Sequence, residues 1–214
     1  MSVELRKHIE EIVPLNDQEF EIINSYFKSK SLKKHQYLIQ EDEAVKNIYF
    51  VVKGLLKATY TDINGKEYII QFAMENWWIS DFQAFYNNVK SITNISCLEN
   101  VELLSITKEN LDQICSESHK MEHFFRVKNS SGYVALQQRI LSLLTTSPKE
   151  RFEQFTKQYP QLLQRVSKTI IAAYLGISRE TLSRLSGKLW FNAHKICDSG
   201  PLTGFSIQLN LFYN

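Results

Sequence analysis

The stretch KTIIAAYLGISRETLSRL, residues 168–185, has the pattern of two short helices joined by a tight turn. Ala172 is small enough to let a second helix cross the first, and Gly176 can adopt the left-handed backbone conformation that such a turn requires. Apolar residues recur where they can face one core, at Ile171, Leu175, Ile177, Leu182 and Leu185. The stretch therefore predicts a helix-turn-helix.

Polar residues occupy the other face of the second predicted helix. They are Ser178, Arg179, Glu180, Thr181, Ser183 and Arg184. In a helix-turn-helix this second helix lies in the major groove of DNA, where arginine offers a two-pronged donor to guanine and glutamate accepts from the cytosine amino group. The pattern predicts a unit that binds double-stranded DNA.

The distribution of charge supports this interpretation, although the net charge of +2 is small. Residues 148–190 carry eight lysines and arginines against three glutamates, whereas residues 1–147 carry a small excess of acidic side chains. Positive charge is thus concentrated around the predicted helix-turn-helix, as a surface that faces phosphates requires. The alternative is an ordinary solvated helical face.

The rest of the chain divides into short helices, a β-rich segment and a long helix. Pro14 separates two short helical segments, the second of which begins with Asn16 or Asp17 as a cap. Residues 30–107 contain β-branched and aromatic runs between turns, and Asn64-Gly65 is the strongest hairpin signal among them. The predicted fold class is α+β, with an antiparallel, jelly-roll-like β-roll before the helical segments.

Residues 121–144 form one long amphipathic run, which at 1.5 Å per residue would span about 36 Å. A second copy of the same helix is the simplest partner for its apolar stripe, and packing on its own β-roll is the alternative. Pro148 suits the first turn of a following helix. The expected domains are a sensor at 1–118, a dimerisation helix at 119–146 and a DNA-binding domain at 147–214. The apolar positions of the long run include Phe124, Phe125, Leu136, Ile140 and Leu143.

Several other classes of protein are disfavoured. Cys97, Cys115 and Cys197 lack the paired spacing of zinc or iron–sulfur ligands, so we expect reduced thiols and no metal. His119 and His123 could share one helical face, but exposed polar histidines are the simpler interpretation. The charged N-terminus and the absence of a long apolar run predict a cytoplasmic protein without a membrane segment. Phosphate-loop and nucleophile motifs are also absent, so no enzyme is expected.

The order of β-roll, long helix and helix-turn-helix resembles the cyclic-AMP receptor and fumarate/nitrate regulator (Crp/Fnr) superfamily over about residues 10–190. GISRETLSR is the sharpest part of the resemblance, and the flanking segments look like a subgroup common in Bacteroidetes-type bacteria. The family implies that Arg179, Glu180 and Arg184 read bases, that neighbouring hydroxyls and amides grip phosphates, and that RNA polymerase is a partner. The full candidate set for DNA binding is Ser167, Lys168, Thr169, Ser178, Arg179, Glu180, Thr181, Ser183, Arg184 and Lys188.

The ligand side of the resemblance is weaker. Nucleotide-binding members hold the phosphate with a Gly-Glu turn and a later Arg-Ser or Arg-Thr pair, and here those places hold Ser80-Asp81 and Ser91-Ile92. Because neither place supplies a cation, we expect no cyclic AMP binding, no cofactor and an unknown effector. Phe124 and Phe125 lie where such sensors present hydroxyls, which predicts an apolar or filled pocket. The candidate pocket residues are Asp81, Ser91, Ile92, Phe124 and Phe125.

The last segment, residues 191–214, has no clear wing pattern, although FSIQLNLFY alternates like a strand. Two alternative functions remain at this point. One is a small-molecule or cyclic-nucleotide binding module whose DNA-binding half has degenerated. The other is a cupin-like barrel enzyme, which His35 alone cannot equip with a metal cluster.

Overall fold

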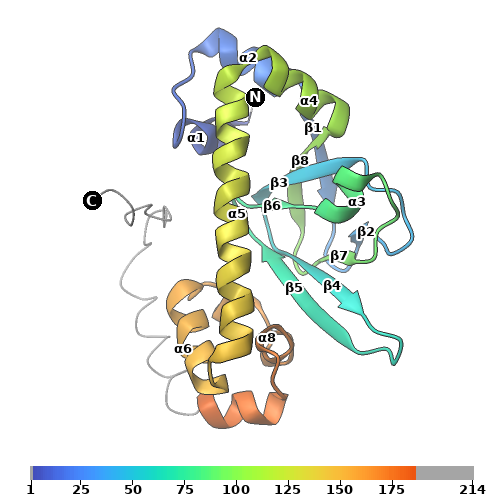
Figure 1. Ribbon diagram of the computed structural model, residues 1–214, viewed down its shortest axis with the longest axis vertical. Helices are drawn as coiled ribbons and strands as arrows, with labels where there is room; N and C mark the ends of the chain where they lie inside the picture. The colour runs from blue at the N-terminus through green and yellow to red at the C-terminus, as the bar shows by residue number, and fades with distance from the viewer. Residues whose placement is uncertain (1, 187–214) are drawn as a thin grey trace. The chain divides into compact units, whose positions relative to one another are not determined.

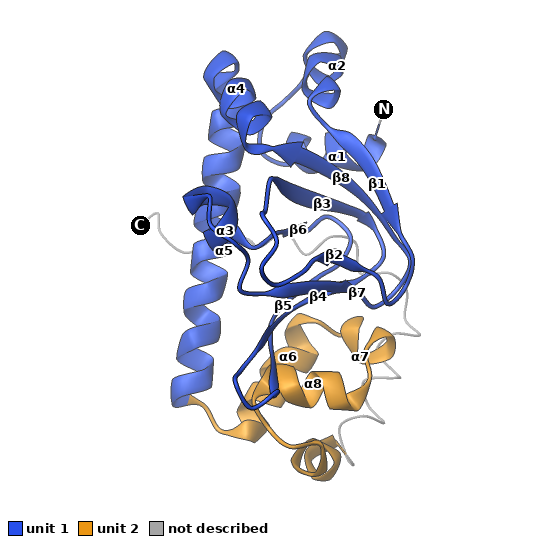
Figure 2. Cartoon of the chain, turned by 90° about the vertical axis from the view of Figure 1, so that its right-hand side faces the viewer, with its two compact units in different colours: residues 1–145 blue, residues 146–214 orange. Residues whose placement is uncertain are grey.

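A computed structural model describes residues 2–186 of the chain and divides it into two compact units, Met1–Thr145 and Thr146–Asn214. Figure 2 colours the two units, which are described separately below. Met1 and residues 187–214 lie outside the described part, and with them lie Lys188, Cys197 and the strand predicted in FSIQLNLFY.

The first unit begins with two short helices, α1 (Val3–Glu10) and α2 (Asp17–Ser25). Asn16 caps α2: its side chain accepts from the amide of Glu19, and the Glu19 carboxylate accepts from the amide of Asn16. Leu5, Ile9 and Phe20 are buried on the inner faces of these helices. The two helices expected on either side of Pro14 are thus present.

Two four-stranded antiparallel sheets form the β-roll that follows (Figures 1 and 2). The first sheet has the order β1 (Lys28–Leu32), β8 (Val101–Thr107), β3 (Asn47–Lys53) and β6 (Trp78–Ile79). The second has the order β2 (Tyr37–Ile39), β7 (Asn94–Cys97), β4 (Leu56–Thr61) and β5 (Glu67–Ala73). Both sheets contribute side chains to one core, among them Phe50, Leu56, Ile95 and Leu103.

Two glycines shape the turns of the β-roll. Gly65 has a φ of 77° in the loop that joins β4 to β5, where its amide donates to the carbonyl of Asp62. Asn64 does not share this conformation, so the hairpin exists but does not need left-handed backbone at both residues. Gly54 has a φ of 96°, and a Cβ there would lie 2.3 Å from the carbonyl oxygen of Asn100, so the turn after β3 admits no side chain.

Three helices complete the first unit: α3 (Phe82–Asn87), α4 (Lys108–Glu117) and the long α5 (His119–Thr145). The first half of α5 is part of the domain core through Met121, Phe124 and Phe125. Farther along, Arg139 donates a 2.8 Å hydrogen bond to the carbonyl of Ile69 in β5. The long helix therefore lies against the β-roll in its own unit (Figure 1).

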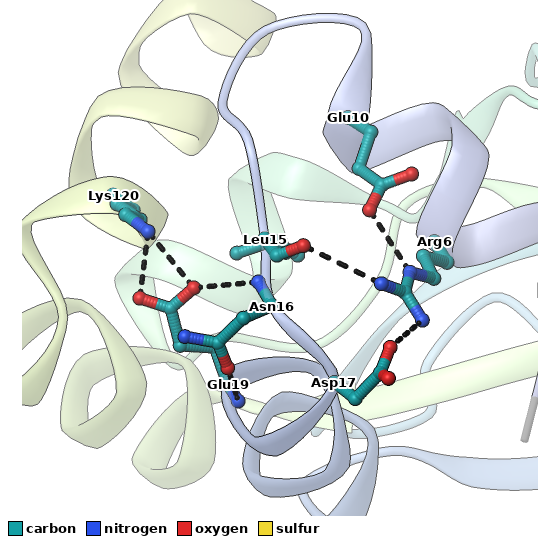
Figure 3. Close-up of polar contacts among 7 residues, drawn as sticks. All are labelled: Arg6, Glu10, Leu15, Asn16, Asp17, Glu19 and Lys120. Carbon is teal, nitrogen blue, oxygen red and sulfur yellow. Dashed lines mark hydrogen bonds and ion pairs between the residues drawn. The ribbon is translucent and has the colours of Figure 1, made fainter.

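Ion pairs hold the N-terminal helices to α5 (Figure 3). Lys120 in the first turn of α5 donates to both carboxylate oxygens of Glu19, at 2.6 and 2.8 Å. Within the N-terminal segment, Arg6 donates to Glu10, Asp17 and the carbonyl of Leu15. These contacts tie the start of α5 to the cap of α2.

The second unit contains α6 (Pro148–Gln158), the short α7 (Leu162–Arg165), α8 (Lys168–Leu175) and a further helix over residues 179–186. Ser147 and Glu150 form a capping box at the start of α6, and Pro148 stands in its first turn. Phe152 and Phe155 are buried on α6, and the ring of Phe155 lies 5.4 Å from that of Tyr174 on α8. The antiparallel β-roll followed by helices confirms the predicted fold class.

Candidate nucleic-acid interface and sensor site

The turn between α8 and the helix over residues 179–186 has the geometry that the sequence predicts. Ser167 caps the start of α8 by accepting from the amide of Ile170, and Gly176 ends the helix with φ 67° and ψ 35°. The amide of Ile177 then donates to the carbonyl of Ala172 at 3.0 Å. This pattern closes the helix end with a left-handed residue and redirects the chain into the second helix.

The inner faces of these two helices are buried. Ile171, Ala172, Leu175 and Leu182 have at most 3% of their surface exposed. Ile177 and Leu185, which we expected in the same core, are only half-buried. They lie at the margins of the contact, where one side of each residue still meets solvent.

Most of the predicted DNA-binding residues are at the surface of the second unit. Thr181 is half-buried, and Lys188 lies outside the described residues. We call the exposed polar residues of the second helix and its cap, 178–184, the reading face. The exposed members of the predicted set are Ser167, Lys168, Thr169, Ser178, Arg179, Glu180, Ser183 and Arg184.

Hydrogen bonds and charges within the reading face fix the start of the second helix and the ionisation of Glu180. Ser178 is the cap of the second helix, since its hydroxyl oxygen accepts from the amide of Thr181 at 3.1 Å. A hydrogen bond from its own amide and one from Ser178, together with the charges of Arg179 and Arg184, lower the pKa of Glu180. Glu180 is therefore an ionised acceptor beside two guanidinium groups.

In the first unit, the structure brings Asp81, Ser91 and Ile92 together. Oδ2 of Asp81 accepts from the Ser91 hydroxyl at 2.8 Å, the Thr93 hydroxyl at 3.1 Å and the Ile92 amide at 3.2 Å. Oδ1 accepts from the amide of Ala84 at 3.0 Å, which makes Asp81 the cap of α3. We call these five residues the Asp81 cluster.

The Asp81 cluster is closed to solvent at its centre. Asp81 is 6% exposed and Ser91 is 1% exposed, whereas Ile92 is about half exposed and contributes only its amide. Burial raises the pKa of Asp81, but the hydrogen bonds from Ala84, Ser91, Thr93 and Ile92 outweigh it and leave that pKa below its ordinary value. Asp81 is an ionised, fully coordinated carboxylate.

Phe124 and Phe125 belong to an aromatic cluster with Trp78 rather than to the Asp81 cluster. The ring of Trp78 lies 5.4 Å from that of Phe125 and 5.3 Å from that of Phe50. Its indole nitrogen donates to Nε2 of His8 at 3.3 Å, so α1 also takes part. Burial and the nearby Lys128 lower the pKa of His8 to about 3, which keeps the imidazole neutral near pH 7.

Sequence reasoning missed three participants in these sites. Thr93 and the amide of Ala84 complete the coordination of Asp81, and an Asp three residues before an Ala amide is a recognisable cap signal only when the short helix α3 is known. His8 lies 70 residues from Trp78 in the sequence, so no local pattern indicates their contact.

The second half of α5 presents apolar side chains to solvent. Tyr133 is 70% exposed, Leu136 is 51% and Leu144 is 76%. Ile140 and Leu143 are also exposed, in contrast to the buried Phe124 and Phe125 of the first half. The helix thus changes from a core element to an uncovered apolar surface along its length.

Two searches of residues 2–186 gave negative findings. None of the helices in this part combines the length and the apolar character that crossing a membrane requires. Within the same residues, no three histidine, cysteine, aspartate or glutamate side chains come together as possible ligands of one metal ion.

These features define a class of protein: a β-roll, a long helix with an uncovered apolar stripe, and a helix-turn-helix with a polar outer face. Comparisons with known proteins agree with that class. The cyclic nucleotide-binding domain family matches residues 29–118. Over most of its length the chain is also similar to proteins that are named as regulatory proteins.

The relatives have low sequence identity to this chain, but the similarity extends over most of each protein. Regulatory protein HlyX of Actinobacillus pleuropneumoniae is 24% identical over 172 residues, which cover 75% of this chain and 71% of HlyX. The anaerobic regulatory protein of Haemophilus influenzae is 24% identical over 186 residues, which cover 81% of this chain and 72% of the relative. Both are regulatory proteins by name. The Bacteroidetes-type subgroup stays a prediction.

A solved structure supports the fold. FixK2 from Bradyrhizobium japonicum superposes with a TM-score of 0.67 at 16% identity, covering 78% of this chain and 85% of FixK2. At this identity the likeness establishes the arrangement of the backbone alone. It agrees with the α+β architecture built above from the sheets and helices.

Proposed function

We propose that the protein is a homodimeric transcription regulator that recognises a specific sequence in double-stranded DNA. The observation that carries this proposal is the reading face, where Arg179, Glu180, Ser183 and Arg184 are exposed on a helix whose opposite side is buried. Arginine can pair with a guanine edge, and the ionised Glu180 can accept from a cytosine amino group. Ser167, Lys168 and Thr169 at the start of α8 are suited to phosphate contacts.

The proposed dimer rests on the second half of α5. Tyr133, Leu136, Ile140 and Leu144 recur at intervals of three or four residues, so they share one side of the helix, and each is about half exposed or more. A second copy of the same stripe would remove these side chains from water. Two reading faces would then address successive major grooves, and RNA polymerase is the expected further partner.

The proposed sensor differs from a nucleotide-binding one because an internal carboxylate uses the donors at the phosphate position. The Ser91 hydroxyl and the Ile92 amide both donate to Asp81. A phosphate would have to compete with a buried negative charge for those donors, and the cluster contains no cation to neutralise it. We therefore propose that cyclic AMP is not the effector and that no cofactor is bound there.

Selection from a random pool of duplex DNA tests the proposed recognition. A two-fold-related site should be enriched, with half-sites about one helical turn, roughly 34 Å, apart. Selection should be repeated with extracts of small molecules, because an effector can be required for binding. A pool without enrichment in any of these conditions would contradict sequence-specific recognition.

The mass of the protein in solution tests the dimer. Light scattering should give about twice the 25.0 kDa of one chain. Replacing Leu136 and Ile140 with glutamate should produce monomers, because four negative charges would meet across the two-fold axis. Ile22→Glu is the matched control, since Ile22 is an exposed apolar residue of α2, away from this stripe. A wild-type mass near that of one chain would overturn the dimer.

Calorimetric titration with cyclic AMP tests the sensor. We expect no binding beyond a weak association, since the donors of the Asp81 cluster are already paired. Submicromolar affinity would contradict the proposal that Asp81 has replaced an external anion.

A further inference from the structure

Arg151 connects two backbone segments that are far apart in the sequence of the second unit. It lies in the first turn of α6, and its side chain is half-buried. Nε donates to the carbonyl of Leu175 at 3.0 Å, and Nη1 donates to the carbonyl of Thr146 at 2.6 Å. One guanidinium therefore joins the linker after α5 to the end of α8.

The carbonyl of Leu175 lies at the turn between the two helices of the helix-turn-helix. Leu175 is the last residue of α8, and Gly176 directly after it takes the left-handed conformation. The amides of Gly176 and Ile177 satisfy the carbonyls of Ala172 and Ala173, whereas the Leu175 carbonyl accepts from Arg151. The guanidinium also places positive charge at the C-terminus of α8, where the helix dipole favours it.

The linker end of the same contact is also held in place. Thr146 is followed by Ser147, whose amide donates to the Glu150 carboxylate at 2.7 Å within the capping box of α6. Phe152, next to Arg151, is fully buried, so the helix that carries the guanidinium is itself anchored in the core. The contact therefore joins two restrained segments through a rigid helix.

We propose that Arg151 is a positioning residue for DNA recognition, which keeps the linker after α5 and the turn before the reading face at fixed places relative to each other. The proposal rests on the proposed function, and it adds a residue that does not itself touch DNA. Arginine is suited to this role because Nε and Nη1 donate in fixed directions in one plane. A lysine ammonium on its flexible stem cannot hold both carbonyls in the same geometry.

Amide hydrogen exchange on the full-length chain without DNA tests the contact directly. In Arg151→Met and Arg151→Lys, the amides of Gly176, Ile177 and Leu182 should exchange about tenfold to a hundredfold faster, the range expected for losing a charge-assisted hydrogen bond. Lys149→Met is the matched control, because Lys149 is in the same turn and its only described ion pair is a loose one with Glu153 at 3.8 Å. Unchanged exchange at these amides in Arg151→Lys would overturn the proposal.

Binding to the selected DNA site and to a scrambled duplex tests the consequence for recognition. Positioning requires the ratio of specific to non-specific affinity to fall about tenfold or more in Arg151→Lys, while non-specific affinity, which depends on charge, stays the same. An equal loss on both duplexes would show that Arg151 acts only on folding or charge, and would refute positioning. If Arg151→Met does not fold, Arg151→Lys carries the test, since it keeps the charge and the stem.

The two experiments separate this inference from the proposed function. A wild-type protein that selects no DNA sequence refutes the proposed function, and with it the recognition role of Arg151. Faster exchange in Arg151→Lys together with normal discrimination between duplexes refutes positioning alone. Faster exchange together with lost discrimination supports both.

Discussion

The Asp81 cluster and the reading face use the same kinds of side chain in opposite ways. In the cluster, a carboxylate and two hydroxyls are buried, and both hydroxyls and two backbone amides of the chain donate to Asp81. On the reading face, a carboxylate, two guanidinium groups and two hydroxyls are exposed to solvent. The polar groups of the Asp81 cluster are thus bonded to one another inside the fold, whereas those of the reading face are open to solvent.

This difference separates polar groups that stabilise the fold from polar groups that are available to a partner. A buried polar group that loses its hydrogen-bond partner lowers the free energy of unfolding far more than an exposed one, because no water replaces the partner. We therefore expect substitutions in the cluster to change stability, and substitutions on the reading face to change DNA binding.

The largest effect is expected for Asp81→Ala. Removing the carboxylate leaves the Thr93 hydroxyl and the amides of Ala84 and Ile92 without their acceptor, while the Ser91 hydroxyl keeps only the Thr93 carbonyl. The free energy of unfolding should therefore fall by about 2–4 kcal/mol. Urea denaturation of the full chain measures it. The control is Asp112→Ala, which removes an exposed carboxylate paired with Lys108 and should change stability little. An equal effect of both substitutions would erase the contrast between the two regions.

Arg179→Ala should have the next largest effect, on binding rather than stability. If Arg179 pairs with a base edge, the loss is about 1–3 kcal/mol at one base position, with relaxed preference there. Fluorescence anisotropy against single-base variants of the selected site measures it. Lys7→Ala, which removes an exposed positive charge from α1, should leave the preference intact. A uniform loss across all sites would instead make Arg179 a phosphate contact.

Ser178 both stabilises the fold, as a helix cap, and is exposed to a partner, so it tests the two roles at one position. Its hydroxyl caps the helix over residues 179–186, so Ser178→Ala should lower the stability of the second unit by about 1 kcal/mol. Ser178→Asp keeps a capping oxygen but adds a negative charge on the side proposed to meet phosphate. We expect normal thermal unfolding and weaker DNA binding for Ser178→Asp. Normal DNA binding by Ser178→Asp would mean that Ser178 acts only as a cap.

The smallest expected effect is the pH dependence that Asp81 contributes. Its pKa is lower in the folded protein than in the unfolded chain, so its contribution to stability is complete above the unfolded pKa and is lost as pH falls through the folded pKa. Denaturation of wild type and Asp81→Asn across the acid range should therefore converge as pH falls. A difference between the two proteins that stays constant with pH would show that the carboxylate is not ionised.

The sequence predicted the elements whose patterns are strong and local. The strands β3, β4 and β5, the long helix and the helix-turn-helix all follow from periodicity, and Gly176 marks the turn. Other elements, among them β1 and α3, had no such signal. β1 is the polar segment KSKSL, which is extended because it pairs with β8, and α3 is too short for a helical period to show.

The two candidate sites were predictable to different degrees, because one depends on a local helical pattern and the other on contacts between separate segments. Exposure of the reading face follows from the helical pattern, since the apolar positions define the buried side. The coordination of Asp81 depends on how the loop at residues 91–93 closes over the start of α3, and its separate hydrogen bonds have no pattern in the sequence. The contact of Arg151 with Leu175 spans 24 positions and depends on the crossing of two helices.

The change along α5 from buried to uncovered side chains affects how the protein must be measured. In the proposed dimer, folding and association are linked, because part of the apolar surface is removed from water only when two chains meet. The midpoint of thermal unfolding should then rise with protein concentration. Diluting the protein would weaken the fold as well as its hold on a two-fold-related DNA site.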